Sequence, residues 1–268
     1  MRLSLFILLL SLTLSAAGIP KNAPFPGGVI VQEIRSDVRP KVYYGKRQLM
    51  VLEGTTKGTY TVIAGLRLSQ KVNKPYKMRI VENKKEQFHT FHIEDKTYKK
   101  QYITIKNKRK VSPKKMDMKR INSESKRSRM ALALFTPKKF DSLKMLKPVD
   151  VNISDDYGKR RYFNNKPRRP HSGVDMPSPV GTPIIAPLSG KIVDLGGFFF
   201  NGNVIFIDHG LGLVSMYCHM SKFSVKKGEV VKKGQKIGEV GMTGRVTGPH
   251  LHWGVSLNGA MVDPRLFF

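Results

Sequence analysis

The chain has 268 residues, 40% of them hydrophobic, and its formal net charge is +29. A chain of this length is long enough for two domains and can bury a core without covalent cross-links. The single Cys218 cannot form an internal disulfide, which excludes the small disulfide-stabilised secreted folds.

The first 17 residues predict a secretory signal peptide. Arg2 precedes an apolar run from Leu3 to Leu10, and the small residues Ser15 and Ala16 follow it. The run is shorter than the roughly 20 apolar residues that span a bilayer, and an uncleaved N-terminal anchor is the alternative. We therefore expect an exported protein, located in the periplasm or, as a second possibility, secreted from the cell.

The excess of basic residues is concentrated before the C-terminal third of the chain. Residues 96–148 contain 18 Lys and Arg against three acidic residues, whereas residues 171–268 contain nine against six. Such a charge attracts polyanions, here an anionic wall polymer or a membrane surface, unless it is only a solvated surface. The export signal argues against nucleic acid as a partner.

Residues 24–110 are predicted to form an N-terminal all-β domain, preceded by a Pro- and Gly-rich linker. Short β-prone runs separated by Gly, Pro and Asn are typical of a small sandwich or barrel. The runs are Val29–Ile34, Gln48–Leu52, Thr59–Leu66, Lys77–Val81 and Tyr102–Asn107. His89 and His92 lie three apart in this region, so in a strand they point to opposite faces, and we expect them to be structural.

Residues 111–150 are predicted to form a basic helical connector. The best helix candidate is Ser123–Phe135, with Ser123 as its N-cap. Residues 136–170 contain four prolines and little periodicity, which predicts an extended segment without regular structure.

Residues 151–268 predict a second all-β domain, and four of the seven histidines lie there in three short motifs. The motif HSGVD contains His171 and Asp175, MYCHM contains His219, and TGPHLHW contains His250 and His252. In a strand, His250 and His252 project from one face and can reach one small site. Neutral imidazoles and carboxylates are the ligands that catalytic zinc prefers.

Neighbouring residues are expected to have other roles. Strand alternation places Tyr217 and His219 on one face and Cys218 on the other, which predicts a packing role for the thiol. His209, at the end of a predicted strand, is expected to be structural. Glycines flanking the motifs are expected to permit tight turns or close approach of a substrate; these are Gly173, Gly244 and Gly248, and Thr243 and Thr247 lie in the same loop.

The segment from His171 to the C-terminus resembles the M23 metallopeptidases, the lysostaphin/LytM-type peptidoglycan hydrolases. The resemblance extends from HSGVDMPSPVGTPIIAPLSGKIV through NVIFIDHGLGLVSMYCHM to TGPHLHWGV, over about a hundred residues. The preceding residues and the N-terminal β region are similar to the longer Gram-negative members. This resemblance implies an antiparallel β-sheet peptidase domain joined by a short helix to a smaller sandwich-like domain.

The resemblance also implies a role for each motif residue. His171, Asp175 and His252 match the zinc ligands, with one Zn²⁺ per chain, and His219 and His250 match the catalytic histidines. The implied activity is a zinc endopeptidase acting on peptide cross-links of peptidoglycan. The similarity to Gram-negative members favours D-alanyl–diaminopimelate bonds over glycine bridges as the substrate, and we expect the protein to be a monomer.

Several alternatives stay open at this point. The acid and base roles of His219 and His250 are exchangeable. The chain is alternatively a catalytically silent wall-binding protein or an activator of other wall hydrolases, or a carrier-like barrel with incidental histidines. The N-terminal domain binds wall, positions the enzyme or shields the groove, and in the last case Asn164 and Asn165 would lie over the metal.

Overall fold

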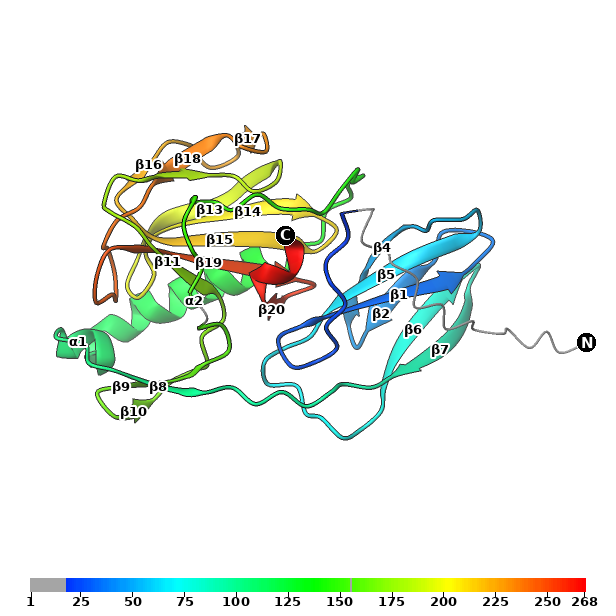
Figure 1. Ribbon diagram of the computed structural model, residues 1–268, viewed down its shortest axis with the longest axis horizontal. Coiled ribbons are helices and arrows are strands. Elements are labelled where there is room, and N and C mark those ends of the chain that lie inside the picture. Colours follow the sequence, from blue (N-terminus) through cyan, green and yellow to red (C-terminus); the bar gives the residue numbers. More distant parts are fainter. Residues whose placement is uncertain (1–17, 155) are drawn as a thin grey trace, which may run out of the picture.

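A computed structural model describes residues 18–154 and 156–268 of the chain. The predicted signal peptide at residues 1–17 therefore lies outside the described residues. Figure 1 shows two β-rich parts side by side, with one long helix against the C-terminal part. No helix within the described ranges has both the length and the apolar character needed to cross a bilayer.

The N-terminal part is a sandwich of two antiparallel sheets, as predicted. One sheet has the order β1-β5-β4 and the other β3-β2-β6-β7. Their shared core contains Val42, Leu49, Val62 and Met78. The strands are β1 (Val29–Arg35), β2 (Lys41–Tyr44), β3 (Arg47–Gln48), β4 (Met50–Glu53), β5 (Thr59–Gly65), β6 (Tyr76–Glu82) and β7 (Lys85–Phe91).

The connecting segment is more ordered than the sequence indicated. The long helix α2 spans Met118–Leu132, so the prediction that it begins after Ser123 is wrong. The short helices α1 (Lys108–Val111) and η2 (Lys115–Asp117) precede it, and Asp117 rather than Ser123 occupies its N-cap position. Ser123 lies in the second turn, where its side chain does not cap the helix.

The expectation of an extended segment over residues 136–170 holds for the described residues up to 159, which form no helix or strand, but not for residues 160–167. Strand β9 (Arg160–Phe163) pairs in parallel with β8 (Lys100–Ile103) and antiparallel with β10 (Lys166–Pro167). The pairing partner of β9 lies some 60 residues upstream, and local sequence patterns cannot reveal a partner at that distance. This small sheet borders the groove described below.

The C-terminal part is built on one large antiparallel sheet. Its path is β11-β19-β15-β14-β13-β17, with β20 paired to β19, and a small sheet β12-β18-β16 lies beside it. The strands are β11 (Val174–Pro177), β12 (Pro183–Ile185), β13 (Gly190–Phe198), β14 (Gly202–Gly210), β15 (Leu213–Met220), β16 (Lys222–Phe223), β17 (Val230–Val231), β18 (Lys236–Glu239), β19 (His250–Leu257) and β20 (Ala260–Val262), followed by η3 (Pro264–Phe267).

Helix α2 covers one face of this large sheet. Ala131 packs with Phe198, Phe206 and Met216 of the sheet, which are all buried. At the solvent edge of this contact, the Arg127 guanidinium donates two hydrogen bonds to the Asp194 carboxylate at 2.7 and 2.9 Å. The basic helix is therefore fixed to the C-terminal part and is not a free linker.

The two parts share one hydrophobic core. Val29, Met50 and Ile63 of the first sheet belong to the same buried cluster as Leu257 and Val262 of the C-terminal part. A Cβ added at Gly65 would lie 2.5 Å from the carbonyl oxygen of Leu257, so the backbones approach closely here. The central strand of the first sheet is consequently buried on both of its faces.

This shared core predicts a single cooperative unfolding transition. Ile63→Ala removes a fully buried side chain from the common core and should lower the free energy of unfolding by about 2–5 kcal/mol. Thermal unfolding followed by circular dichroism should show one transition moved to lower temperature. The control Phe88→Ala, at an exposed position of β7, should shift it little. Two separate transitions, with Ile63→Ala affecting only one, would contradict a common core.

Candidate metal centre and active site

The pairing of β11 with β19 brings the motif residues together. Asp175 lies directly opposite His252, and Pro177 lies opposite His250. Leu251 and Trp253 alternate with the two histidines and are fully buried in the main core. Because side chains alternate along a strand, His250 and His252 both point from the opposite face of the sheet, as predicted.

Three potential ligand atoms converge at this face. His252 Nδ1 lies 2.9 Å from Asp175 Oδ1 and 2.9 Å from His171 Nε2, and His171 Nε2 lies 3.2 Å from Asp175 Oδ1. Among the described residues, these three form the group of His, Cys, Asp and Glu side chains that is arranged to hold a metal ion. The predicted set of His171, Asp175 and His252 is therefore assembled in space.

The separations fit a small tetrahedral cation. Zinc–nitrogen and zinc–oxygen bonds of about 2.0–2.1 Å place neighbouring ligand atoms of a tetrahedron roughly 3.3 Å apart. The observed separations of 2.9–3.2 Å are close to that spacing. Two nitrogens and one carboxylate oxygen also match the donor set of catalytic zinc sites, which leave a fourth position open.

A second layer of residues orients these ligands. The Asp156 carbonyl and carboxylate both lie 3.1 Å from His171 Nδ1, so this nitrogen carries the proton and Nε2 keeps its lone pair. Arg161 bridges the two acids, donating to Asp156 Oδ2 at 2.8 Å and to Asp175 Oδ2 at 2.7 Å. Asp156 and Arg161 were missed in the sequence because neither belongs to a histidine motif.

Gly173 allows the His252 ring to occupy its place. A Cβ at Gly173 would lie 2.8 Å from both Cε1 and Nε2 of His252 and 2.5 Å from the Trp253 carbonyl oxygen. Gly244 has φ +83° and packs against the backbone of Gly202, whereas Gly248 has open space around it. The expected backbone role thus applies to Gly173 and Gly244, while at Gly248 a Cβ would meet nothing nearby.

His219 and His250 lie beside the convergent ligands. The ring centroids of His219 and His250 are 4.9 Å apart, and those of His219 and His252 are 6.1 Å apart. His219 Nδ1 donates to the Thr243 carbonyl at 2.8 Å, and His250 Nδ1 donates to the Gly248 carbonyl at 2.9 Å. Both rings therefore hold a proton at Nδ1 and keep the lone pair of Nε2 for other work.

Strict strand alternation fails at His219, so the prediction that Tyr217 and His219 share a face is wrong. His219 has φ +66°, a left-handed conformation that is unusual for a non-glycine residue and that clusters at functional sites. Tyr217 is buried in the main core, whereas Cys218 packs with Phe198 and Phe206 below α2. The backbone twist at His219 brings its ring to the same side as His252.

Burial and neighbouring charges set the protonation of the site. Burial, followed by the nearby His252 and His250, lowers the pKa of His219 to about 3, which keeps this ring neutral at neutral pH. Burial lowers the pKa of His252. Burial alone would raise the pKa of Asp175, but hydrogen bonds from His171 and His252 hold it well below its ordinary value. Burial alone would lower the pKa of His171, but its hydrogen bonds with Asp156 and Asp175 raise it. The site thus offers an ionised carboxylate at Asp175 and a neutral imidazole at His252, the forms that bind a metal.

An open groove leads to these residues. It has a volume of about 380 Å³, and His219, His250 and Asp175 lie along it. The apolar part of its walls comes from Ile103, Ile105 and Phe163 of the β8–β9 region and from Val246 and Pro249 of the β18–β19 loop. Arg161 and Arg245 add positive charge. The groove therefore joins apolar walls and positive charge beside the convergent ligands.

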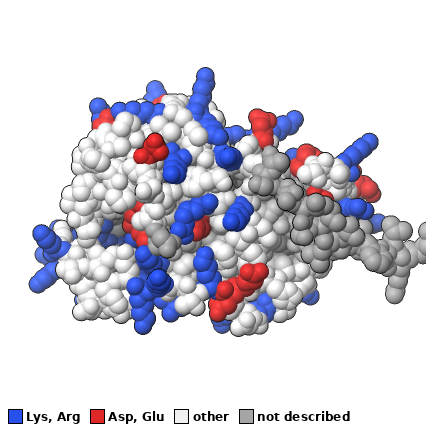
Figure 2. Space-filling model, viewed as in Figure 1, with Lys and Arg blue, Asp and Glu red and all other residues white. Residues whose placement is uncertain are grey.

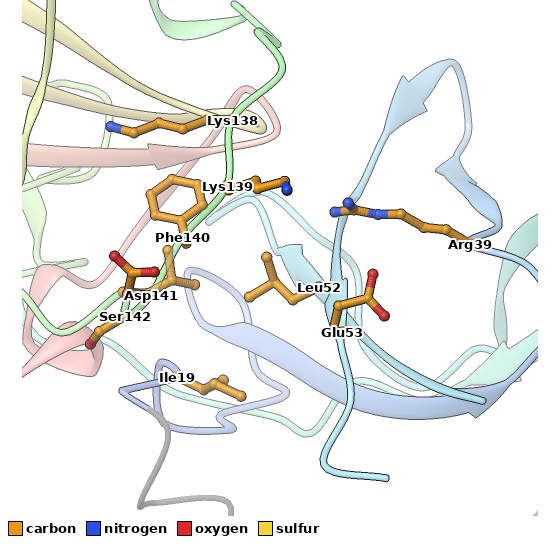
Figure 3. Close-up of a pocket in the computed structure, with 10 residues that line it drawn as sticks. Ile19, Arg39, Leu52, Glu53, Lys138, Lys139, Phe140, Asp141 and Ser142 are labelled. Atoms are coloured by element: carbon orange, nitrogen blue, oxygen red, sulfur yellow. The ribbon is translucent and has the colours of Figure 1, made fainter. Parts of the chain in front are cut away.

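A second hollow lies at the junction of the two parts, away from the histidines. Figure 3 shows Arg39, Leu52 and Glu53 of the first part across from the connecting segment, where Lys139 extends toward Arg39 and Lys138 points away from it. Its charged groups have mixed signs, and Lys138 Nζ already donates to the Ser189 carbonyl at 2.8 Å. The hollow therefore offers no set of groups for chemistry.

Other predicted residues take structural positions. Asn164 accepts from the N–H of Ile105 at 2.8 Å and donates to its carbonyl at 3.1 Å. Asn164 and Asn165 line a separate hollow with Tyr102 and Ile103 and are not among the residues that line the groove. His89 lies in β7 and His92 follows that strand, both in the N-terminal sandwich. Neither contributes to the convergent group.

Comparison with known proteins agrees with this geometry. The profile for "Peptidase family M23" matches residues 169–264, and that for "Peptidase family M23 N-terminal domain" matches residues 22–96. A solved M23 peptidase structure from Pseudomonas aeruginosa is 36% identical, with a TM-score of 0.77 over 92% of this chain and 95% of that one. The chain belongs to peptidase family M23.

Two curated relatives come from Vibrio cholerae serotype O1. Peptidoglycan DD-endopeptidase ShyA is 41% identical over 43% of this chain, and peptidoglycan DD-endopeptidase ShyC is 45% identical over 44% of it. The chain matches 28% of the length of each of these relatives. The similarity to them thus concerns less than half of this chain and less than a third of theirs.

His209 lies outside the site and has the structural role predicted from the sequence. It is fully buried and bonded to Ser215 Oγ at 2.7 Å and to the Ser189 carbonyl at 3.1 Å. Burial lowers the pKa of His209 from 6.5 to about 4. Because the unfolded chain binds this proton first, the contribution of His209 to stability is complete above pH 6.5 and is lost as pH falls toward 4.

The stability at stake is of the order of 3 kcal/mol. In His209→Gln the free energy of unfolding should therefore fall less steeply between pH 7 and pH 4.5 than in the wild type, as measured by urea titration at each pH. Parallel pH curves for the two proteins would show that His209 does not titrate as its burial requires.

Proposed function

We propose that the protein is an exported zinc endopeptidase that hydrolyses peptide cross-links of peptidoglycan, at D-alanyl–diaminopimelate bonds. The main support is the convergence of His171, Asp175 and His252 beside two further imidazoles at an open groove. The two Vibrio cholerae relatives, named peptidoglycan DD-endopeptidases, support the same substrate class.

In this proposal one Zn²⁺ per chain is held by His171, Asp175 and His252. When bound, zinc polarises a peptide carbonyl and lowers the pKa of a water molecule toward neutrality. Asp156 and Arg161 hold the ligands in place, since each makes hydrogen bonds to a ligand side chain within 3.1 Å.

His219 and His250 are the proposed catalytic residues. Each has Nδ1 fixed on a backbone carbonyl, so its Nε2 can accept a proton from water or pass one to the leaving amine. The low pKa of His219 keeps this ring neutral before reaction. One of the two takes the proton from the attacking water at its Nε2. The other can give a proton to the amine only after its own Nε2 has accepted one, and either order agrees with these contacts.

The groove suits a peptide substrate. Its apolar walls can receive aliphatic side chains, and its arginines favour a substrate that carries negative charge. The alternative function, a catalytically silent wall-binding protein or activator, would need neither the three converging ligand atoms nor the two oriented imidazoles. Their presence favours the enzyme.

We further propose the following division of the chain and its surroundings. Residues 1–17 are a signal peptide, 24–110 an N-terminal domain, 111–150 a connector and 151–268 the peptidase domain. The enzyme acts as a monomer in the periplasm. Lys and Arg side chains project from both parts on the face shown in Figure 2. The exposed Lys119, Lys126 and Arg129 of α2 form no ion pair with an acidic side chain of the described residues. These basic groups would hold the enzyme near anionic wall polymer or membrane surface.

Zinc retention tests the ligand set. His252→Ala removes one of three ligands and should reduce zinc to well below one equivalent per chain, measured by atomic absorption after gel filtration. Cys218→Ala is the control. Cys218 lies on β15 directly opposite His252 but packs in the hydrophobic cluster under α2, so this variant should keep one equivalent of zinc per chain. Full zinc retention by His252→Ala would remove this residue from the metal centre.

Digestion of peptidoglycan tests the activity. The zinc-loaded protein should release uncross-linked peptides from purified diaminopimelate-type wall, and a chelator should stop the release. His219→Ala should keep zinc but lose about 10²-fold or more in rate, because a proton-transfer group is missing. Mass spectrometry of the fragments identifies the bond. Zinc-loaded wild type that releases nothing would exclude the enzyme and leave the activator.

A further inference from the structure

Arg245, in the loop between β18 and β19, occupies an unusual position in the groove. Its guanidinium carbon lies 4.5 Å from the ring centroid of Phe163 and 4.5 Å from that of Phe200. Its backbone N–H donates to the Phe200 carbonyl at 2.9 Å, which fixes the start of the side chain. The guanidinium is thus clamped between two aromatic rings and half-buried.

No carboxylate of the described residues pairs with this guanidinium. Its hydrogen bond is a long one, 3.5 Å from Nη1 to the Lys110 carbonyl. Five other arginines of the connector and the C-terminal part, unlike Arg245, form ion pairs with carboxylates. Arg109 pairs with Asp117, Arg120 with Glu124, Arg127 with Asp194, Arg161 with Asp156 and Asp175, and Arg265 with Asp263.

The surroundings of Arg245 make the missing partner costly. Burial, followed by the neighbouring Arg168 and Arg161, lowers the pKa of Arg245 to about 10, so the group stays charged at neutral pH. A partly buried cation without a counter-charge loses hydration, and the two aromatic rings and one long hydrogen bond compensate for only part of that loss. An anionic group of a bound ligand in the groove would supply the counter-charge that the Arg245 guanidinium lacks.

The geometry points to Arg245 as a specificity-determining residue that binds a free carboxylate of the substrate peptide beside the scissile bond. This inference rests on the proposed function. Arg245 lines the same groove as His219, His250 and Asp175, so a ligand bound to it also lies along the reacting groups. A planar guanidinium with parallel N–H groups is suited to bidentate binding of a carboxylate.

The chemistry of the cross-link indicates which carboxylate this is. In a D-alanyl–diaminopimelate bond, the carbon that carries the acylated nitrogen also carries a carboxylate. In a lysine-type cross-link the corresponding carbon carries only hydrogen. Arg245 would therefore favour the diamino-diacid cross-link, because a substrate without the carboxylate leaves the half-buried guanidinium unpaired.

The test compares two synthetic cross-linked peptides with the zinc-loaded enzyme. One has a free carboxylate on the carbon next to the scissile nitrogen, and the other has the same group as a primary amide. The wild type should show kcat/KM about 10- to 100-fold higher for the free carboxylate, the range expected for a hydrogen-bonded charge pair. In Arg245→Gln this ratio should fall close to one.

Arg168→Gln is the matched control. Arg168 is a neighbouring, partly buried arginine that binds the carbonyls of Val111 and Pro167 and does not line the groove. The Arg168→Gln variant loses the same positive charge as Arg245→Gln, and its ratio of kcat/KM for the two peptides should equal that of the wild type. Arg245→Lys keeps the charge but loses the fork, and its ratio should lie between those of Arg245→Gln and the wild type.

Each outcome decides the matter. Equal cleavage of the two peptides by the wild type overturns the inference without any substitution, even if a variant fails to fold. Equal loss on both peptides in Arg245→Gln shows a structural role and overturns it as well. A zinc-loaded wild type that cleaves neither peptide nor purified wall refutes the proposed function itself, and the inference with it.

Discussion

The register of β11 against β19 determines the geometry of the whole site. It sets Asp175 opposite His252, and His171 reaches the same point from the chain just before β11. A shift of one residue would turn Asp175 toward the core and Val174 toward the groove, because side chains alternate along a strand. Val174 and Trp253, paired in the same register and fully buried, anchor it by packing. Core packing on one face of these strands therefore fixes the ligand positions on the other.

The rigidity of the site comes from layers that lie outside it. The face of the sheet opposite the site packs into a core that continues into the N-terminal sandwich, while α2 covers a neighbouring area on the side of the histidines. The pairing of β8 with β9 brings Gln101 next to Arg161. The Gln101 Oε1 accepts a hydrogen bond from the Arg161 guanidinium at 2.9 Å, and this guanidinium in turn donates to the ligand Asp175. Strand β8, which follows the N-terminal sandwich in the chain, thus forms part of the wall of the groove through Gln101 and Ile103.

The sequence was most informative where local pattern and side-chain chemistry coincide. The alternation in TGPHLHW correctly placed His250 and His252 on one face, and the motif HSGVD correctly indicated that His171 and Asp175 can converge. The all-β class, the two-part organisation and the helix between the parts were likewise predicted. At Ser123 the capping signal was misleading because α2 already begins five residues earlier, after a short 3-10 turn.

Features that depend on distant contacts or unusual backbone geometry were not visible in the sequence. The twist at His219 depends on a positive φ that no residue preference announces, since histidine rarely adopts it. Arg161, Asp156 and Arg245 gain their meaning only from neighbours far along the chain, such as Phe200 and Phe163 around Arg245. The parallel pairing of β8 with β9 joins segments separated by the three helices α1, η2 and α2, and neither segment alone indicates it.

X-ray absorption spectroscopy at the zinc edge of the wild-type protein tests the central claim most directly. The account predicts one zinc per chain with a first shell of nitrogen and oxygen only, at about 2.0–2.1 Å, with the outer-shell scattering of two imidazole rings. A sulfur neighbour near 2.3 Å, or a shell without imidazole scattering, would contradict it.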